Sequence, residues 1–265
     1  MMKKHLKFNT KCKLCLLPSL AGTAIFFVIP YIRVLYYSLI DNQFRRNFVG
    51  LDNYIETLNN EYFRLALLNS LLIIAIAVPV LIVLALIISL VLSFGIRKLK
   101  KLRTAFILPM LIPTASVVLI WRMIFTDTAT PLPIYLLFIW KNIGICIILL
   151  TVAFTGIDEN IYEAAKLDGA GTFTLHRKIT VPMIMPTILF TVLLSIVNSF
   201  RVFKESYLFY GTNYPPDHSY TLQYYMNNNF LKLDYQSLAT SAVLTSLIVF
   251  LIVTAGMALQ RRWER

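Results

Sequence analysis

Long stretches without a charged residue recur along the chain and set the pattern of its structure. Each is close to the ~20 apolar residues that a helix needs to cross the hydrocarbon core of a membrane. Strands of a membrane barrel would instead alternate over about 10 residues. The pattern therefore predicts an all-α, polytopic membrane protein. The charge-free stretches are residues 14–32, 65–94, 104–121, 181–200 and 235–260, and only Lys141 interrupts a sixth at 133–154.

These stretches predict six transmembrane helices in a single membrane domain that covers residues 1–265. We expect a kink at Pro79, because prolines are tolerated within spans where neighbouring helices satisfy the freed backbone groups. The longest stretch outside the spans has about 30 residues, too few for a soluble domain with its own core. The predicted spans are 14–39, 65–94, 104–125, 133–154, 182–203 and 235–259.

The basic residues are distributed unevenly between the two sides of the predicted membrane domain. The net charge of +12 would suggest nucleic-acid binding in a soluble protein. With six spans and both termini inside, sixteen Lys and Arg residues fall in inner segments and five in outer ones. This asymmetry follows the positive-inside rule. It predicts a multi-pass protein of the cell (inner) membrane, surrounded by lipid, with both termini cytoplasmic and no nucleic-acid partner.

Residues that could carry catalysis or hold a metal are scarce in the sequence. Cys12 and Cys15 form a Cys-x-x-Cys pair without a second Cys/His pair nearby, so we expect no zinc there. The sequence holds no nucleophile elbow and no Gly-x-x-x-x-Gly-Lys-Ser/Thr loop for nucleotide phosphates. We therefore expect no enzyme active site, no catalytic residue, no metal and no cofactor.

The most polar inner segment, between the fourth and fifth spans, predicts a helix, a turn and a second helix on the cytoplasmic surface. Asp158 and Glu159 supply the negative charge that a helix N-terminus favours. Gly169 can end this helix and allow a sharp turn, and residues 172–179 can form a second short helix. Pro182 then suits the first turn of the fifth span. Such a helix–turn–helix element, joined to two spans, would be suited to transmit a movement of a cytoplasmic partner to these spans.

This segment resembles the EAA loop of binding-protein-dependent ABC importer permeases. Three features match the family pattern in residue type and spacing: Glu163-Ala164-Ala165, the following Gly169, and the closing Ile179-Thr180-Val181-Pro182. The first outer loop, with Phe48-Val49-Gly50-Leu51-Asp52-Asn53-Tyr54, is similar to the carbohydrate-uptake branch, which includes maltose-, lactose- and glycerol-phosphate-type permeases. The chain departs from the pattern at Val181, where Leu is usual, and lacks the usual Gly-Gly-Pro after the fifth span.

The resemblance implies a permease subunit that forms the path for a sugar or related carbohydrate and depends on a separate ATPase subunit. The EAA loop would dock in a groove of that ATPase, with Glu163 facing basic residues. Without the resemblance, Glu163 would be interpreted as a surface carboxylate paired with Lys166. A second, distinct permease and an extracytoplasmic solute-binding protein, docking near Asn53 and Tyr214, are also implied. The expected coupling residues are Glu163, Ala164, Ala165, Asp168, Gly169, Ala170, Ile179 and Pro182.

Polar residues within the fourth and fifth spans are candidates for the substrate pathway. Lys141 lies about 20 Å from the inner surface at the helical rise. A cation at such a depth is a functional candidate, although a structural ion pair or snorkelling toward the interface explains it too. Small polar groups within spans also serve as contacts between helices. The candidate pathway residues are Lys141, Ser195, Asn198, Ser199 and Phe203.

Two other functions fit parts of the pattern. The same type of importer could carry another small solute, such as a polyamine or a metal chelate. A stand-alone secondary transporter would be expected to show paired carboxylates inside the spans or an inverted repeat, and neither Asp nor Glu lies in a predicted span. Neighbouring genes for a solute-binding protein, a second permease and an ATPase would separate these possibilities.

Overall fold

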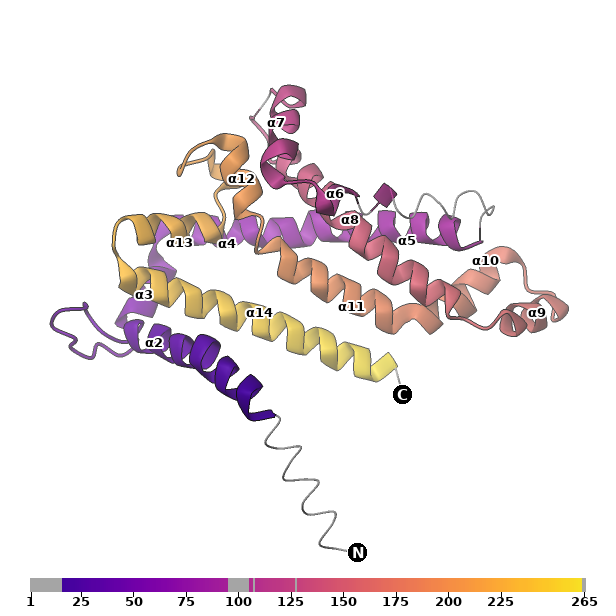
Figure 1. The fold of residues 1–265 in the computed structure, drawn as a ribbon, viewed down its shortest axis with the longest axis horizontal. Helices are drawn as coiled ribbons and strands as arrows, with labels where there is room; N and C mark the ends of the chain where they lie inside the picture. Colours follow the sequence, from indigo (N-terminus) through magenta and orange to yellow (C-terminus); the bar gives the residue numbers. More distant parts are fainter. Residues whose placement is uncertain (1–15, 95–104, 107, 127, 264–265) are drawn as a thin grey trace, which may run out of the picture. The chain divides into compact units, whose positions relative to one another are not determined.

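The computed structural model describes residues 16–94, 105–106, 108–126 and 128–263, and helices make up most of them (Figure 1). Within these ranges, extended pairing is limited to an isolated antiparallel bridge between Ile40 and Phe48. The all-α prediction is therefore confirmed. The helices, with η for π and 3₁₀ turns, are η1 (Ala24–Val28), α2 (Ile29–Tyr37), α3 (Asp52–Asn59), α4 (Glu61–Leu72), η2 (Ile73–Ala77), α5 (Val78–Phe94), α6 (Leu108–Leu111), α7 (Thr114–Ile124), α8 (Leu132–Thr155), α9 (Glu159–Leu167), α10 (Thr172–Leu175), η4 (His176–Thr180), α11 (Val181–Ser199), α12 (Phe203–Tyr210), η5 (Asp217–Ser219), α13 (Leu222–Leu231) and α14 (Tyr235–Trp263).

The chain divides into two compact units. The first comprises Met1–Asn60, described from residue 16 onward, and Asn229–Ser246. The second comprises Glu61–Asn228 and Leu247–Arg265. Helix α14 begins in the first unit and ends in the second. The pockets described below are lined by residues of the second unit alone.

In the first unit, side-chain hydrogen bonds hold the loop that follows α2. The Asn53 amide donates to the carbonyl oxygens of Ser38 and Ile40 at 3.0 and 2.9 Å. The Tyr54 hydroxyl shares a hydrogen bond of 2.7 Å with the Ser38 hydroxyl. Because backbone carbonyl groups away from water need such partners, Asn53 has a structural role in this loop.

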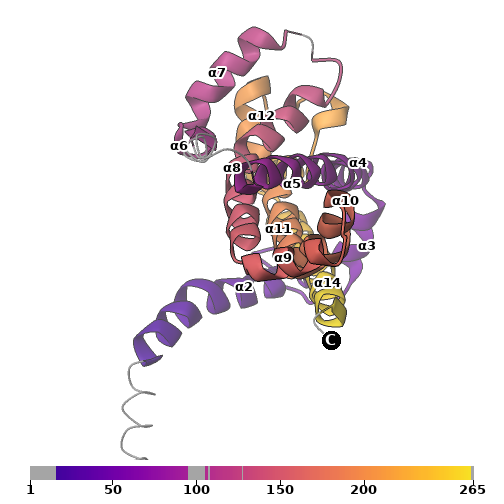
Figure 2. The same ribbon diagram turned by 90° about the vertical axis from the view of Figure 1, so that its right-hand side faces the viewer.

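In the second unit, helices α5, α8 and α11 run side by side (Figures 1 and 2). They bury aliphatic side chains such as Leu81, Ile147 and Ile184. The Ser89 hydroxyl of α5 bonds the Ala85 carbonyl oxygen at 2.6 Å and also lies 3.2 Å from the carbonyl oxygen of Ile147 on α8. Small hydroxyl residues of this kind let apolar helices approach closely. Two of these helices, α8 and α11, also carry side chains of the first pocket described below.

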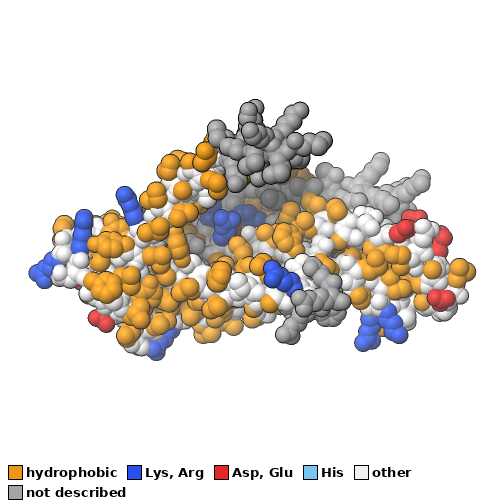
Figure 3. Space-filling view, turned by 90° about the horizontal axis from the view of Figure 1, so that it is seen from below, with side chains coloured by type: hydrophobic (Ala, Val, Ile, Leu, Met, Phe, Trp, Pro, Cys, Tyr) orange, Lys and Arg blue, Asp and Glu red, His pale blue; other side chains and the backbone are white. Residues whose placement is uncertain are grey.

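Many large apolar side chains point outward. Phe26, Phe27 and Phe250 are 73%, 72% and 63% exposed, and Figure 3 shows apolar side chains over much of the visible face. Apolar patches of this extent mark surfaces that meet a membrane or a partner. Five described helices are long and apolar enough to cross a membrane: Leu16–Tyr37, Glu61–Ser93, Leu132–Thr155, Thr172–Ser199 and Tyr235–Ala258.

The predicted third span, residues 104–125, differs from the other five. Its described part contains two short helices, α6 and α7, and neither reaches the length of a membrane span. Pro113 separates them in an extended conformation, with φ −55° and ψ 130°. A proline cannot donate a helical hydrogen bond, and its ring clashes with the carbonyl of residue i−4. The count of six spans therefore stays a prediction, with this segment in two pieces.

Among the described residues, three long helices contain a π-helical turn, and each such turn ends two residues before a proline. η1 precedes Pro30, η2 precedes Pro79 and η4 precedes Pro182. In each case the N–H of the residue before the proline bonds the carbonyl oxygen five residues earlier. The wider turn relieves the clash between the proline ring and the preceding turn. At Pro79, where the sequence predicts a kink, the helix continues through such a turn.

The second short helix predicted at residues 172–179 is not separate from the fifth span. α10, η4 and α11 form one continuous helix, Thr172–Ser199. Pro182 has helix on both sides, because the π turn of η4 accommodates its ring. The helix of the fifth span, predicted from residue 182, therefore begins ten residues earlier, at Thr172, and Pro182 lies in the first turn of α11, as the sequence suggests.

Candidate functional site

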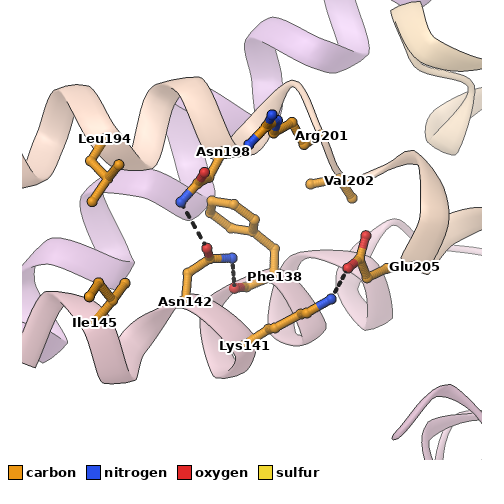
Figure 4. A pocket seen from close by; sticks show the side chains of 9 residues that line it. All are labelled: Phe138, Lys141, Asn142, Ile145, Leu194, Asn198, Arg201, Val202 and Glu205. Atoms are coloured by element: carbon orange, nitrogen blue, oxygen red, sulfur yellow. Dashed lines mark hydrogen bonds and ion pairs between the residues drawn. The ribbon is translucent and has the colours of Figure 1, made fainter. Parts of the chain in front are cut away.

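A pocket of about 490 Å³ opens among α8, the end of α11 and α12 (Figure 4). This volume is typical of small-molecule sites. The turn between α11 and α12 is only three residues long, so it brings the first turn of α12 over α8. The lining residues are Phe138, Lys141, Asn142, Ile145, Leu194, Asn198, Arg201, Val202 and Glu205.

Lys141 forms an ion pair at one side of this pocket. Its ammonium group on α8 contacts the carboxylate of Glu205 on α12 and donates to the Thr114 hydroxyl of α7 at 2.7 Å. The side chains of Lys141 and Glu205 are 26% and 12% exposed. The structural ion pair that the sequence left open as an explanation of Lys141 is thus present, and the same residue also lines the pocket.

Two asparagines face each other across the pocket (Figure 4). The Asn198 amide of α11 donates to the Asn142 side-chain oxygen of α8 at 3.2 Å. The Asn142 amide in turn donates to the Phe138 carbonyl oxygen at 2.8 Å. Each Asn has two N–H donors and an oxygen with two lone pairs. The pair therefore retains both donors and acceptors that a ligand could use.

The other three candidate pathway residues lie outside the lining. The Ser195 hydroxyl donates to the Thr191 carbonyl oxygen at 2.8 Å and lies 3.6 Å from the Cys146 sulfur of α8. The Ser199 hydroxyl donates to the carbonyl oxygen of Ile196 at 2.7 Å. The Phe203 ring meets the Tyr224 ring edge-on, with centroids 4.9 Å apart. The structure thus brings Lys141 and Asn198 together and places Ser195, Ser199 and Phe203 in packing contacts.

Sequence reasoning does not select three polar residues of the lining, Asn142, Arg201 and Glu205. A signal for Glu205 exists, because a cation inside a span needs a counter-charge and Glu205 is the first acidic residue after the predicted fifth span. Asn142 directly follows Lys141 in the same predicted span. Arg201 sits in the turn between α11 and α12, which sequence reasoning assigns to the span.

A second pocket, of about 540 Å³, lies between α9 and the start of the helix Thr172–Ser199. Figure 1 shows α9 and α10 at the end of the second unit away from α12. Acidic side chains gather on the surface at that end in Figure 3. The lining residues are Glu159, Tyr162, Glu163, Lys166, Ala170, Gly171, Thr172, Leu175 and His176.

The N-terminus of α9 is capped as the sequence suggests. Asp158 is the N-cap, and its carboxylate accepts a hydrogen bond from the Asn160 N–H at 3.0 Å. Glu159 lies in the first turn. Negative charges here interact favourably with the helix dipole, so the start of α9 is well defined.

The C-terminus of α9 depends on Gly169. Gly169 has a φ of +81°. Its N–H bonds the Lys166 carbonyl oxygen, and the N–H of Ala170 bonds the Ala165 carbonyl oxygen, both at 3.0 Å. This Schellman arrangement needs a left-handed residue after the C-cap. The prediction that Gly169 ends the helix and sets the turn is confirmed.

The residues expected to couple the chain to a partner lie at or near the surface of α9 and the helix that follows. Glu163 and Lys166 are exposed and line the second pocket without forming an ion pair with each other. The remaining coupling residues are Ala164, Asp168, Gly169 and Pro182, which are exposed, and Ala165, Ala170 and Ile179, which are half-buried.

The segment between α12 and α13 is held to α4. The Asn69 amide of α4 donates to the carbonyl oxygens of Asp217 and Tyr220 at 2.5 and 2.8 Å. Burial raises the pKa of Tyr220 to about 12, so its hydroxyl stays neutral and pairs with the Asn228 amide at 3.1 Å. Tyr214 on the same segment is 65% exposed, which leaves it accessible to a partner.

Of the three cysteines in the sequence, Cys146 lies within the described residues. Cys12 and Cys15 lie outside the described residues. Cys146 is buried in α8 as a free thiol. No group of three or more His, Cys, Asp or Glu side chains suited to a metal ion occurs within the described ranges.

Comparison with known proteins gives consistent matches. Residues 63–265 match the family described as binding-protein-dependent transport system inner membrane component. The chain is 28% identical over 274 residues to the arabinooligosaccharides transport system permease protein AraP of Bacillus subtilis (strain 168), covering 89% of this chain and 84% of that protein. It is 27% identical over 270 residues to the lactose transport system permease protein LacF of Rhizobium radiobacter, covering 92% and 90%. Its fold is similar to a crystal structure of a bacterial ABC transporter involved in alginate import, with a TM-score of 0.76, 24% identity and 98% of both chains covered.

Proposed function

The chain belongs to the family of binding-protein-dependent transport system inner membrane components, and we propose that it is the permease subunit of an ABC importer for a sugar or related carbohydrate. The family match, which extends over residues 63–265, carries this proposal. Relatives that align over most of their length are named as permeases for arabinooligosaccharides and for lactose. In this role the chain provides the path for the substrate, and the ATP is hydrolysed on another subunit.

The pocket among α8, α11 and α12 supports a carbohydrate substrate. Sugar hydroxyl groups both donate and accept hydrogen bonds, and the facing amides of Asn142 and Asn198 offer both functions. In this proposal Lys141 and Asn198 line the path directly. Ser195, Ser199 and Phe203 act behind the lining. Ser195 contacts Cys146 of α8, Ser199 bonds a carbonyl oxygen of its own helix, and Phe203 packs against Tyr224 of α13.

Helix α9 is the proposed docking element for the ATPase. It is short, capped at both ends and largely exposed, with Glu163 available for a basic partner side chain. Ala164 and Ala165 let another backbone come close, because their side chains are small. The Schellman turn at Gly169 fixes the direction in which the chain leaves α9. The groove beside α9 gives a protruding side chain of the partner a place to enter.

The continuous helix Thr172–Ser199 connects this docking element to the pocket. Near the start of this helix, Leu175 and His176 belong to the lining of the second pocket, beside α9. Near its end, Asn198 belongs to the lining of the first pocket, among α8, α11 and α12. A displacement of α9 on ATP binding can therefore reach the pocket through the short turn at Gly169 and one continuous helix.

The proposal includes three partners and an orientation. The ATPase binds on the cytoplasmic side at α9, and a second, distinct permease completes the path. An extracytoplasmic solute-binding protein delivers the substrate near the exposed Tyr214. Asn53, also expected there, is engaged within its own loop and shapes that surface. Both termini lie in the cytoplasm, as the basic residues predict.

A graded series at Gly169 tests the coupling role. A Cβ at this position meets nothing within 4 Å, so the cost of a substitution comes from the φ of +81°. That cost is about 1–2 kcal/mol for an ordinary residue, lower for Asn and higher for a β-branched residue. We expect co-purification of the ATPase and sugar uptake to fall in the order Gly169→Asn, Gly169→Ala, Gly169→Val, while the amount of inserted protein stays the same.

The matched control for this series is Gly211. It has a φ of +67° and is equally free of neighbours, but it follows α12 at the other end of the second unit. Gly211→Val should leave ATPase co-purification intact. Normal co-purification and uptake with Gly169→Val would show that α9 is not the coupling element.

A further inference from the structure

The charges around the substrate pocket do not cancel. Three charged side chains line it, namely Lys141, Arg201 and Glu205. Lys141 and Glu205 neutralise each other in an ion pair. Arg201 remains as an additional cation, because Glu205 is the only acidic residue in the lining and is already engaged.

Arg201 is positioned to meet a ligand. It lies in the turn between α11 and α12, three residues after Asn198, and its side chain is exposed. No hydrogen bond or ion pair joins this side chain to another residue in the described part of the chain. A guanidinium group has five donors and no acceptor, in a planar fork that matches a carboxylate or a phosphate. Within that part of the chain, the donors of Arg201 are therefore left to water or to a ligand.

When a ligand fills the pocket, the charge of Arg201 affects which class of ligand binds most tightly. A bound ligand displaces water from Arg201, and a charged group that loses water without an ionic partner weakens binding. A neutral sugar replaces that water only by hydroxyl groups. A sugar with an anionic group forms charge-assisted, two-pronged hydrogen bonds instead, which are roughly twice as strong as neutral ones. A polyamine would meet two cations and one anion, so like-charge repulsion disfavours it.

We propose that the preferred substrate is a carbohydrate with one anionic group, a carboxylate or a phosphate, which pairs with Arg201 while its hydroxyl groups bind the Asn142–Asn198 pair. This assignment rests on the proposed function, because it takes the pocket to be part of the substrate path. Arg201 is then the residue that determines charge specificity, and the Lys141–Glu205 pair contributes no net charge to the choice.

Three matched probes test the proposal. They are a neutral disaccharide (cellobiose), the same disaccharide with a carboxylate at C6 of the terminal glucose, and the same disaccharide with a phosphate at that carbon. Binding of each is measured by calorimetry to the importer, purified with its partner subunits in lipid nanodiscs and without the solute-binding protein. We expect at least one anionic probe to bind about tenfold or more tightly than cellobiose. The two anionic probes show which acidic group is preferred.

Variants of the lining assign this preference to Arg201. Arg201→Gln should lower the affinity for the anionic probe to that for cellobiose, and Arg201→Lys should restore part of the preference. Lys204→Gln is the matched control, because Lys204 is an exposed cation on α12 outside the lining, and it should leave the preference unchanged. Asn198→Ala should weaken the binding of all probes.

Two results would overturn the charge assignment and leave the proposed function standing. One is equal binding of cellobiose and the anionic probes, lost on Asn198→Ala. The other is an anionic preference that persists in Arg201→Gln. Binding of no probe, or binding that Asn198→Ala leaves unchanged, would overturn both the assignment and the proposed substrate path.

Discussion

At the scale of single residues, Lys141 shows how one charge can be kept within an apolar helix. Its ammonium group is shared between the carboxylate of Glu205 and the hydroxyl of Thr114, which belong to two other helices. Removing a charge from water is expensive, and close, well-arranged partners repay much of that cost. The pair therefore ties α7, α8 and α12 together at the rim of the pocket.

A double-mutant cycle at Lys141 and Glu205 measures this tie. Glu205→Gln leaves the Lys141 cation without its counter-charge and should lower stability by about 1–3 kcal/mol. The double variant Lys141→Met with Glu205→Gln should be closer to the wild type than Glu205→Gln alone, because no unpaired charge remains. The thermal midpoint of the purified protein in detergent is the measurement, with Lys204→Gln as the exposed control. If the effects of Lys141→Met alone and of Glu205→Gln alone add up to that of the double variant, the two residues are not energetically linked.

At the scale of elements, the prolines decide where helices stop and where they continue. Pro113 stands between two short helices and precedes the second one, whereas Pro79 and Pro182 follow π-helical turns through which the helix continues. A sequence shows the prolines but not which outcome each one takes, because both are compatible with the same local pattern. For this reason the sequence does not show that α10, η4 and α11 join into one helix.

Close contact between elements is visible at Gly256. A Cβ on Gly256 of α14 would lie 2.5 Å from the Leu193 Cδ2 of α11. Gly256→Leu should therefore displace the Leu193 side chain or the helices themselves, and it should cost about 1–3 kcal/mol. Adding Leu193→Ala should recover part of the loss, as measured by the thermal midpoint. Gly22, with nothing within 4 Å of an added Cβ, gives the control Gly22→Leu, and an equal loss at both glycines would refute the packing explanation.

At the scale of the whole molecule, much of the architecture is readable from the sequence because the membrane imposes one length on every span. The stretch predicted at 133–154 is the helix Leu132–Thr155, and that at 235–259 is Tyr235–Ala258 within α14. The polar pairings are not readable in this way. Glu205 meets Lys141 across 64 residues of sequence, and Asn198 meets Asn142 across 56, so only the three-dimensional arrangement brings them together.

The orientation in the membrane is tested by labelling single cysteines introduced into a chain whose native cysteines are replaced. Tyr214→Cys and Leu167→Cys are suitable sites, since the side chains are 65% and 89% exposed. Tyr220 is unsuitable, because it is only 6% exposed. A membrane-impermeant maleimide should label position 214 in intact cells and position 167 only after permeabilisation. Labelling of position 167 in intact cells would show that α9 faces the outside. The predicted orientation would then be wrong, and α9 could not be a cytoplasmic docking element.

The helix Thr172–Ser199 has a mechanical consequence that follows from its continuity. Its 28 residues extend about 42 Å at the helical rise. A rod that pivots near its middle moves its two ends in opposite directions, and a rotation of about 5° displaces each end by about 2 Å over this length. If the end of the helix at Thr172 is displaced by α9, a movement of this size at the other end is enough to separate the Asn198 and Asn142 amides, which lie 3.2 Å apart. The same helix that is displaced by α9 would then separate the two asparagines that are proposed to bind the substrate.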